Sequence, residues 1–146
     1  MKLRLVPTLV GLAIGFAATA LAEEQSTVNP EVRQQIEAEL AKFDDAFNNN
    51  DAAAIVSLFT PDAIEVWGWD KSLRAAFGRH AVERRYTLRE TIPEKFSNKL
   101  VQVYPIGDGI CAISELDDPH LKRKDYVVTI YIREANEWKI RMRYVH

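Results

Sequence analysis

Asp44 has the residue type and the position for proton transfer. It lies in the segment Phe43-Asp44-Asp45-Ala46-Phe47, where a helix is expected. At about 100° per residue from Ile36, Asp44 falls about 80° away, at the edge of the apolar stripe, and Asp45 near 180°, facing water. Burial beside an apolar interior moves a carboxyl pKa toward neutral, so Asp44 is a candidate catalytic acid or base. The other interpretation is a boundary carboxylate paired with a nearby Arg or Lys.

His146 is the second candidate for acid–base chemistry. It ends a segment, Trp138 to His146, in which alternate residues share one face of a strand. Trp138, Ile140, Met142, Tyr144 and His146 are predicted on one face, and Lys139, Arg141 and Arg143 on the other. Histidine titrates near neutral pH and is suited to act as a base. As the last residue, however, it is also expected to fray.

Several aromatic side chains could instead bind a ring-bearing ligand or simply fill the core. The candidates for ligand contact are Phe43, Phe47, Trp67, Tyr86, Tyr126 and Tyr144. The segment Asp117-Asp118-Pro119-His120 contains metal-ligand types but has no second ligand group at a recognisable spacing. We therefore expect neither a metal nor a cofactor. Cys111, in a strand-like run, is interpreted as a buried apolar side chain, with a reactive thiol as the alternative.

The segment from about His80 to Thr91, which Gly78-Arg79 precedes and Pro93 ends, is predicted to form a basic helix. Together with Arg79, it carries His80, Arg84, Arg85 and Arg89, interleaved with Glu83 and Glu90. Two interpretations are open: an anion-binding patch, or a solvated face on which the charges balance.

The elements that would position these residues can be predicted along the chain. Asn29 and Pro30 are suited to cap and begin a helix with an apolar stripe formed by Ile36, Leu40, Phe43 and Phe47. Asp51 is expected to cap a short second helix that Pro61 ends. A strand from Ala63 to Trp67, a loop or irregular hairpin from Gly68 to Gly78, the basic helix and four further strands follow. Helices before a run of antiparallel strands indicate an α+β fold with helices on one face of the sheet.

The N-terminus has the pattern of a secretory signal peptide. Lys2 and Arg4 precede an apolar run from Leu9 to Leu21 that ends in Ala20-Leu21-Ala22. This run is shorter than the ~20 residues that span a bilayer, which favours cleavage over an uncleaved anchor. The expected organisation is a signal peptide over 1–22, a flexible segment over 23–29 and one domain over 30–146. Secretion or a periplasmic location follows, with no stable membrane insertion after cleavage.

Charge argues against a nucleic-acid partner. The formal net charge of −2 becomes −4 when Lys2 and Arg4 leave with the signal peptide. Binding to a phosphate backbone needs a concentrated basic surface, which a mildly acidic domain of this size lacks. A small molecule is therefore the more suitable ligand class.

The order of elements and several local motifs resemble the SnoaL-like branch of the nuclear-transport-factor-2-like (NTF2-like) superfamily. The similar positions are the Phe-x-x-x-Phe helix, Asn50-Asp51, Leu58 to Ala63, Gly78-Arg79 and Glu137-Trp138-Lys139-Ile140. The resemblance implies a cone-shaped curved antiparallel sheet wrapped around the N-terminal helices, an internal pocket and a homodimer through the outer sheet face. It does not fix one activity, because the family includes ketosteroid isomerases, polyketide cyclases, dehydratases and proteins of unassigned activity.

Three functional hypotheses follow. The first is an exported domain that binds a small apolar or aromatic molecule, without an assigned activity. The second is a lyase, isomerase or cyclase that uses Asp44 or His146 as its base. The third is a dimeric interaction or subunit module whose outer sheet face, including Lys139, Arg141 and Arg143, docks a partner.

Overall fold

The computed structural model describes residues 28–69, 72–89, 95–119 and 124–145. The helices are α1 (Pro30–Asn48), α2 (Ala52–Ser57) and α3 (Arg79–Thr87). The strands are β1 (Phe59–Trp69), β2 (Ser72–Phe77), β3 (Ser97–Ile106), β4 (Gly109–Asp117), β5 (Asp125–Glu134) and β6 (Glu137–Val145). The predicted signal peptide and most of the predicted flexible segment lie outside the described residues.

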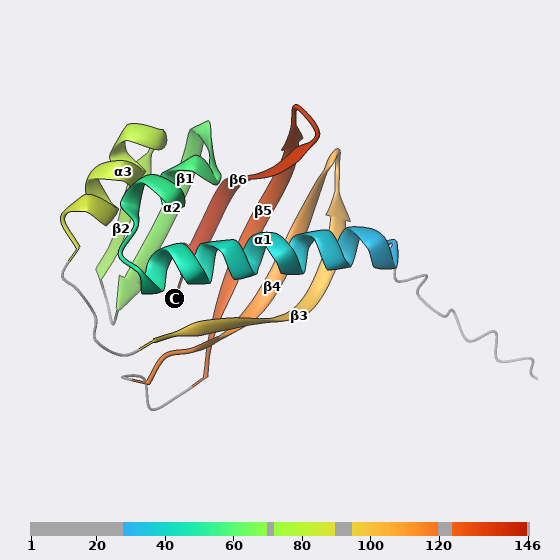
Figure 1. Ribbon diagram of the computed structural model, residues 1–146, viewed down its shortest axis with the longest axis horizontal. Coiled ribbons are helices and arrows are strands. Elements are labelled where there is room, and N and C mark those ends of the chain that lie inside the picture. Colours follow the sequence, from blue (N-terminus) through green and yellow to red (C-terminus); the bar gives the residue numbers. More distant parts are fainter. Residues whose placement is uncertain (1–27, 70–71, 90–94, 120–123, 146) are drawn as a thin grey trace, which may run out of the picture.

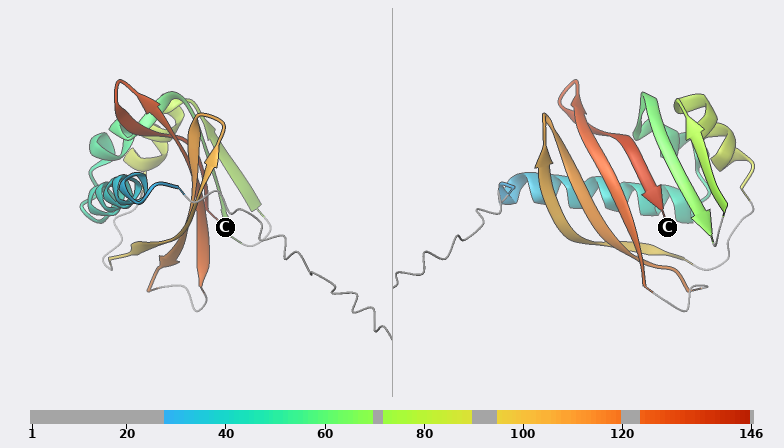
Figure 2. Two further views of the ribbon diagram at one scale, coloured as in Figure 1. Left: turned by 90° about the vertical axis from the view of Figure 1, so that its right-hand side faces the viewer. Right: turned by 180° about the vertical axis from the view of Figure 1, so that it is seen from behind.

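The helices lie on one face of a single curved, open sheet. The strand order is β2-β1-β6-β5-β4-β3, and Figure 1 shows α1 crossing this sheet while α2 and α3 cover its β1–β2 end. Seen edge-on in Figure 2, the described helices are all on the same side of the sheet, and none of them covers the opposite face. The predicted α+β fold, with helices against a curved sheet, is confirmed.

The two predicted helix starts are observed with their capping bonds. The Asn29 side chain accepts a hydrogen bond from the Glu31 backbone N–H, and Pro30 is the first residue of α1. The Asp51 side chain accepts from the backbone N–H of Ala54 at 2.9 Å. These bonds satisfy backbone donors that a helix N-terminus leaves unpaired. From α1, Ile36, Leu40 and Phe43 enter the core.

The segment from Gly68 to Gly78, predicted as a loop or an irregular hairpin, forms a hairpin in which β2 pairs antiparallel with β1 from Ser72 to Phe77. Two other features of the sheet differ from the prediction. The strand β1 runs parallel to β6, so the sheet is not wholly antiparallel. The strand β1 also begins earlier than predicted, at Phe59, with a register shift between Phe59 and Ile64 that accommodates Pro61.

A bulge in β6 reverses the predicted alternation of its side chains. Ile140 pairs with Tyr131 and Met142 with Ile130, so Arg141 is the extra residue between them. A single inserted residue moves every later side chain to the other face. Arg143 and Val145 are consequently buried, while Met142 and Tyr144 lie on the opposite face. The prediction that Arg143 points outward, away from Trp138, was wrong for this reason.

The Arg79 side chain connects the start of α3 to the start of β1 by hydrogen bonds. Its Nε and one terminal nitrogen donate to the Phe59 carbonyl at 3.1 and 2.6 Å. Phe59 is fully buried, so this carbonyl is removed from bulk water and depends on protein donors. The contact fixes α3, and with it the basic side chains of that helix, against β1.

We expect Arg79→Met to lower the free energy of unfolding by about 1–3 kcal/mol, because it removes both donors from a buried carbonyl. The measurement is urea denaturation. Arg84→Met, on the same helix but exposed, is the matched control and should change stability by less than about 0.5 kcal/mol. Equal effects of the two substitutions would contradict the role given to Arg79.

Candidate functional site

A fully buried carboxylate, Glu65, lies at the junction of β1, α3 and β6. Its Oε1 accepts hydrogen bonds from the Tyr86 hydroxyl at 2.6 Å and from Arg143 Nη1 at 3.0 Å. Its Oε2 accepts from Arg85 Nη1 at 2.8 Å. A buried charge is tolerated only when it is paired and hydrogen-bonded, and these three donors meet that requirement.

Aromatic rings surround the two guanidinium groups of this cluster. The Arg143 guanidinium carbon lies 4.3 Å from the centre of the Phe43 ring. The Arg85 guanidinium carbon lies 4.2 Å from the Trp67 ring and 4.6 Å from the Tyr86 ring. These are cation–π distances, which add to the attraction already supplied by Glu65. Burial, together with the negative charge of Glu65, raises the pKa of the Tyr86 hydroxyl, which therefore remains a proton donor.

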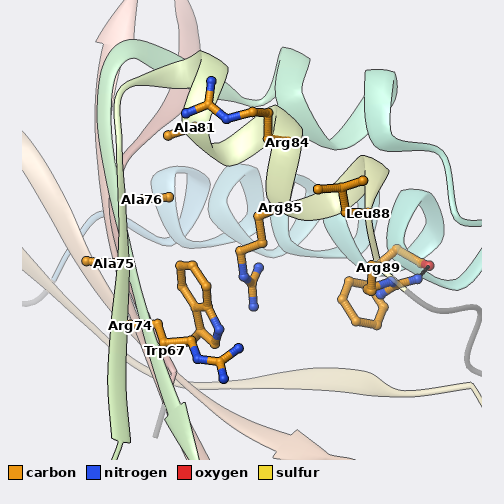
Figure 3. Close-up of a pocket in the computed structure, with 10 residues that line it drawn as sticks. Trp67, Arg74, Ala75, Ala76, Ala81, Arg84, Arg85, Leu88 and Arg89 are labelled. Carbon is orange, nitrogen blue, oxygen red and sulfur yellow. Dashed lines mark hydrogen bonds between the residues drawn. The ribbon is translucent and has the colours of Figure 1, made fainter.

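Arg85 connects the buried cluster to a pocket of about 590 Å³ between α3, β1 and β2. In Figure 3 its guanidinium projects from α3 into this space, between Trp67 and Arg89. The lining consists of two aromatic rings, small or aliphatic side chains and four arginines: Phe47, Trp67, Ala75, Ala76, Ala81, Leu88, Arg74, Arg84, Arg85 and Arg89. The volume is within the usual range for small-molecule sites.

The structure divides the predicted aromatic ligand contacts into three groups. Phe47 and Trp67 line the pocket. Phe43 and Tyr86 lie behind it in the core, with their rings 6.2 Å apart in an edge-to-face arrangement.

Tyr126 and Tyr144 form the third group, outside the pocket. Tyr126 is 48% exposed on β5. The β6 bulge places Tyr144 on the face opposite Arg143. The structure therefore does not bring these two tyrosines together with Trp67. His146, the second catalytic candidate, lies outside the described residues.

Asp44 is half-buried at a different place, beneath β3. Both of its oxygens accept hydrogen bonds from Asn98, from the backbone N–H at 2.8 Å and from the side-chain amide at 2.6 Å. The partner is thus an amide rather than the expected Arg or Lys. Asp44 lines a separate depression between α1 and β3, together with Arg33, Glu37 and Leu100 among others. Asp45 is exposed, as the helical spacing predicted.

The remaining chemical candidates contribute little to the pocket. Cys111 is half-buried on β4, and burial raises the pKa of its thiol, which keeps it protonated. Within the described ranges, no group of three or more His, Cys, Asp or Glu side chains is arranged to hold a metal ion. His120, from the loop considered for metal binding, lies outside those ranges.

Sequence reasoning missed Glu65, although a signal was present. Glu65 lies between Ala63 and Trp67 in the predicted first strand, and alternation puts all three on one face. A glutamate on an inward face requires a cationic partner, and the basic helix that follows supplies Arg85.

We expect Glu65→Gln to lower the free energy of unfolding by about 3–5 kcal/mol, because the variant leaves two guanidinium groups without their counter-charge. Urea denaturation measures the loss. Asp62→Asn is the matched control, since its pair with Arg141 joins side chains that are 60% and 49% exposed. That control should lose less than about 1 kcal/mol. A Glu65→Gln variant as stable as Asp62→Asn would show that the cluster does not carry the stability assigned to it.

Asp44 should make the stability of the protein depend on pH. Burial raises its pKa, and the Asn98 hydrogen bonds and the Arg143 charge offset this only in part. The folded protein then binds the Asp44 proton more tightly than the unfolded chain does. The resulting stabilisation is complete below about pH 4 and is lost as the pH rises through the raised pKa.

In the Asp44→Asn variant we expect this decline to be absent. Urea midpoints measured from about pH 3 to about pH 7 give the comparison, with the exposed Asp45→Asn as a control for the change in net charge. Parallel pH profiles for wild type and Asp44→Asn would contradict the raised pKa.

Comparisons with known proteins identify the fold. No protein-family model matches the sequence, and no curated protein matches it. Solved structures do match. An NTF2-like protein of unknown function from Silicibacter pomeroyi is 16% identical, with a TM-score of 0.64, over 80% of this chain and 95% of its own.

Two further solved structures have comparable similarity. A ketosteroid isomerase-like protein from Erwinia carotovora atroseptica is 18% identical, with a TM-score of 0.64, over 81% of this chain and 96% of its own. ActVI-ORFA from Streptomyces coelicolor is 18% identical, with a TM-score of 0.62, over 80% and 96%. The resemblance inferred from the sequence is confirmed in the arrangement of the chain: this protein has the NTF2-like fold.

Proposed function

We propose that this protein binds a small, ring-bearing molecule in the pocket between α3, β1 and β2. The observation that carries the proposal is the combination of a 590 Å³ pocket with the rings of Trp67 and Phe47 in its wall. Aromatic side chains provide large contact areas for a planar ligand. The NTF2-like fold is a ligand-binding fold, which supports the same conclusion.

Binding without turnover is the function that this lining favours. The pocket walls are formed by aromatic, aliphatic and arginine side chains. Arginine stays protonated at neutral pH, so it anchors a ligand but does not exchange protons with it. The nearest buried carboxylate, Glu65, is fully buried and already accepts three hydrogen bonds. These features favour the binding hypothesis over the lyase, isomerase and cyclase hypotheses.

The proposal includes export and homodimer formation. Export is supported by the sequence pattern of residues 1–22, which predicts that the exported chain begins at Glu23. Among the described residues, no helix combines the length and the apolar character needed to cross a membrane. Pairing through the outer sheet face is supported by the absence of any described helix on that face in Figure 2.

Trp67→Leu should weaken ligand binding at least tenfold, because it removes the largest ring from the pocket wall. Native mass spectrometry of the protein, purified gently from the cells that make it, reports the retained molecule. Tyr126→Leu is the control, since Tyr126 is exposed and distant from this lining. The same spectra should show a dimer of chains that begin at Glu23.

Three results would contradict the proposal. Equal retention of the molecule by wild type and Trp67→Leu would exclude this pocket as its site. A wild-type protein that retains nothing and binds no member of a fragment library would exclude small-molecule binding altogether. A monomer, or a chain that still carries its first residues, would contradict the assembly or the export.

A further inference from the structure

Among the described residues, the side chains around the pocket carry more positive than negative charge. Four arginines line it, and Arg143 lies directly behind it. Among the described residues, Glu65 is the acidic side chain that forms ion pairs with this group, and its single charge is shared by Arg85 and Arg143. Arg143 also interacts electrostatically with Asp44. This group of side chains therefore has a net positive charge, although the formal net charge of the chain is −2. Such a concentration of cations in a recess attracts anions.

Arg89 has no acidic partner among the described residues, and one of its donors has no hydrogen-bond partner there. One terminal nitrogen, Nη2, donates to two neutral acceptors, the Phe47 carbonyl at 2.7 Å and the Asn50 side-chain oxygen. The other, Nη1, is buried and has no hydrogen-bond partner among the described residues. The guanidinium carbon lies 3.5 Å from the centre of the Phe47 ring, so the ring and the unsatisfied donor are side by side. An unpaired buried donor costs free energy that an incoming acceptor would recover.

The other lining arginines differ in their attachment. Arg85 uses Nη1 for Glu65, and its side chain remains 22% exposed. The side chains of Arg74 and Arg84 form no hydrogen bond or ion pair with any residue in the described ranges. In Figure 3 the Arg74 guanidinium lies beside Trp67, whereas Arg84 extends toward Ala81, apart from the other three. Arg74, Arg85 and Arg89 thus surround the space next to the aromatic wall, and Arg84 lies at its edge.

This arrangement selects between the two interpretations of the basic helix. The Arg79 side chain donates hydrogen bonds to the Phe59 carbonyl. Arg85 and Arg89 line the pocket. Among the described residues of this helix, His80 and Glu83, which are 3.5 Å apart on the exposed side, fit the description of a solvated, balanced face. Among the described residues, the basic side chains of this helix therefore fall into two groups, and of those that line the pocket Arg85 alone forms an ion pair, with Glu65.

We propose that the pocket binds a small organic anion, a ring-bearing carboxylate, with its ring against Trp67 and Phe47. The carboxylate accepts hydrogen bonds from Arg74, Arg85 and Arg89. Guanidinium groups suit this task because their paired N–H donors match the two oxygens of a carboxylate. This inference rests on the proposed function and names the chemical class of its ligand.

Three probes of the same shape and different charge test the class. They are naphthoate, naphthalenemethanol and naphthylmethylamine, which present an anion, a neutral group and a cation on one ring system. We expect isothermal titration calorimetry of the purified protein to show naphthoate binding at least tenfold tighter than naphthalenemethanol, with naphthylmethylamine weakest. The preference should decrease as salt is added.

A pair of arginine variants locates the anion. Arg74→Gln should weaken naphthoate about tenfold and leave naphthalenemethanol unchanged, because an exposed arginine is removed without disturbing the cluster. Arg141→Gln, outside the pocket and paired with Asp62, is the matched control and should change neither affinity.

The outcomes separate the two proposals. If the neutral or cationic probe binds as tightly as naphthoate and Trp67→Leu weakens it, the pocket binds small molecules but the anion class is wrong. Equal losses of naphthoate affinity in Arg74→Gln and Arg141→Gln would also overturn the anion class. If none of the three probes binds, the anion class and the proposed function both fail.

Discussion

The buried Glu65 carboxylate is the contact on which the rest of the site depends. It joins β1 to α3 through Tyr86 and Arg85, and β1 to β6 through Arg143. Its donors are separated from it by about 20 and 78 residues along the chain. Removing a carboxylate from water carries a large penalty, which is offset only when all the donors are in place. The cluster therefore requires the helix and both strands to be correctly positioned at once.

The same contact determines the chemistry that the pocket can present. Both oxygens of Glu65 already accept hydrogen bonds from Arg85, Arg143 and Tyr86. The side chains that line the pocket are therefore arginines, aromatic rings and aliphatic groups. Arg85 is held at one end by Glu65 and stacked on Trp67, so little conformational entropy remains to be lost when it binds an anion. The apolar pocket expected from the aromatic content is instead lined by both rings and arginines. Aromatic faces and guanidinium groups suit a ligand that is flat and negatively charged.

Local patterns in the sequence were sufficient for the first helix and for the fold. Asn29, Pro30 and the stripe from Ile36 to Phe47 are local signals, and α1 begins at Pro30 as predicted. The β1–β2 hairpin was predicted only as one of two alternatives, because an edge strand with mostly exposed side chains has no clear apolar alternation. Recognition of the fold needed only the order of the elements, which tolerates such an ambiguity.

The site was less predictable, because it depends on long-range register. The bulge at Arg141 has no local sequence signal, yet it turns Arg143 inward and Tyr144 outward. The helical spacing of Asp44 correctly predicted a half-buried carboxylate, but its amide partner, Asn98, comes from a strand 54 residues away. Trp67 and Phe47 are among the aromatic side chains predicted to contact a ligand, and both lie in the pocket wall. Their contact with a ligand stays a prediction.

The most direct test of the account is a titration of the protein, carrying 15N-labelled arginine, with naphthoate, followed by the guanidinium NMR signals. The account predicts that the signals of Arg74, Arg85 and Arg89 shift together with one affinity, while that of Arg141 stays in place. Shifts confined to arginines outside the pocket, or no shift at saturating naphthoate, would contradict it.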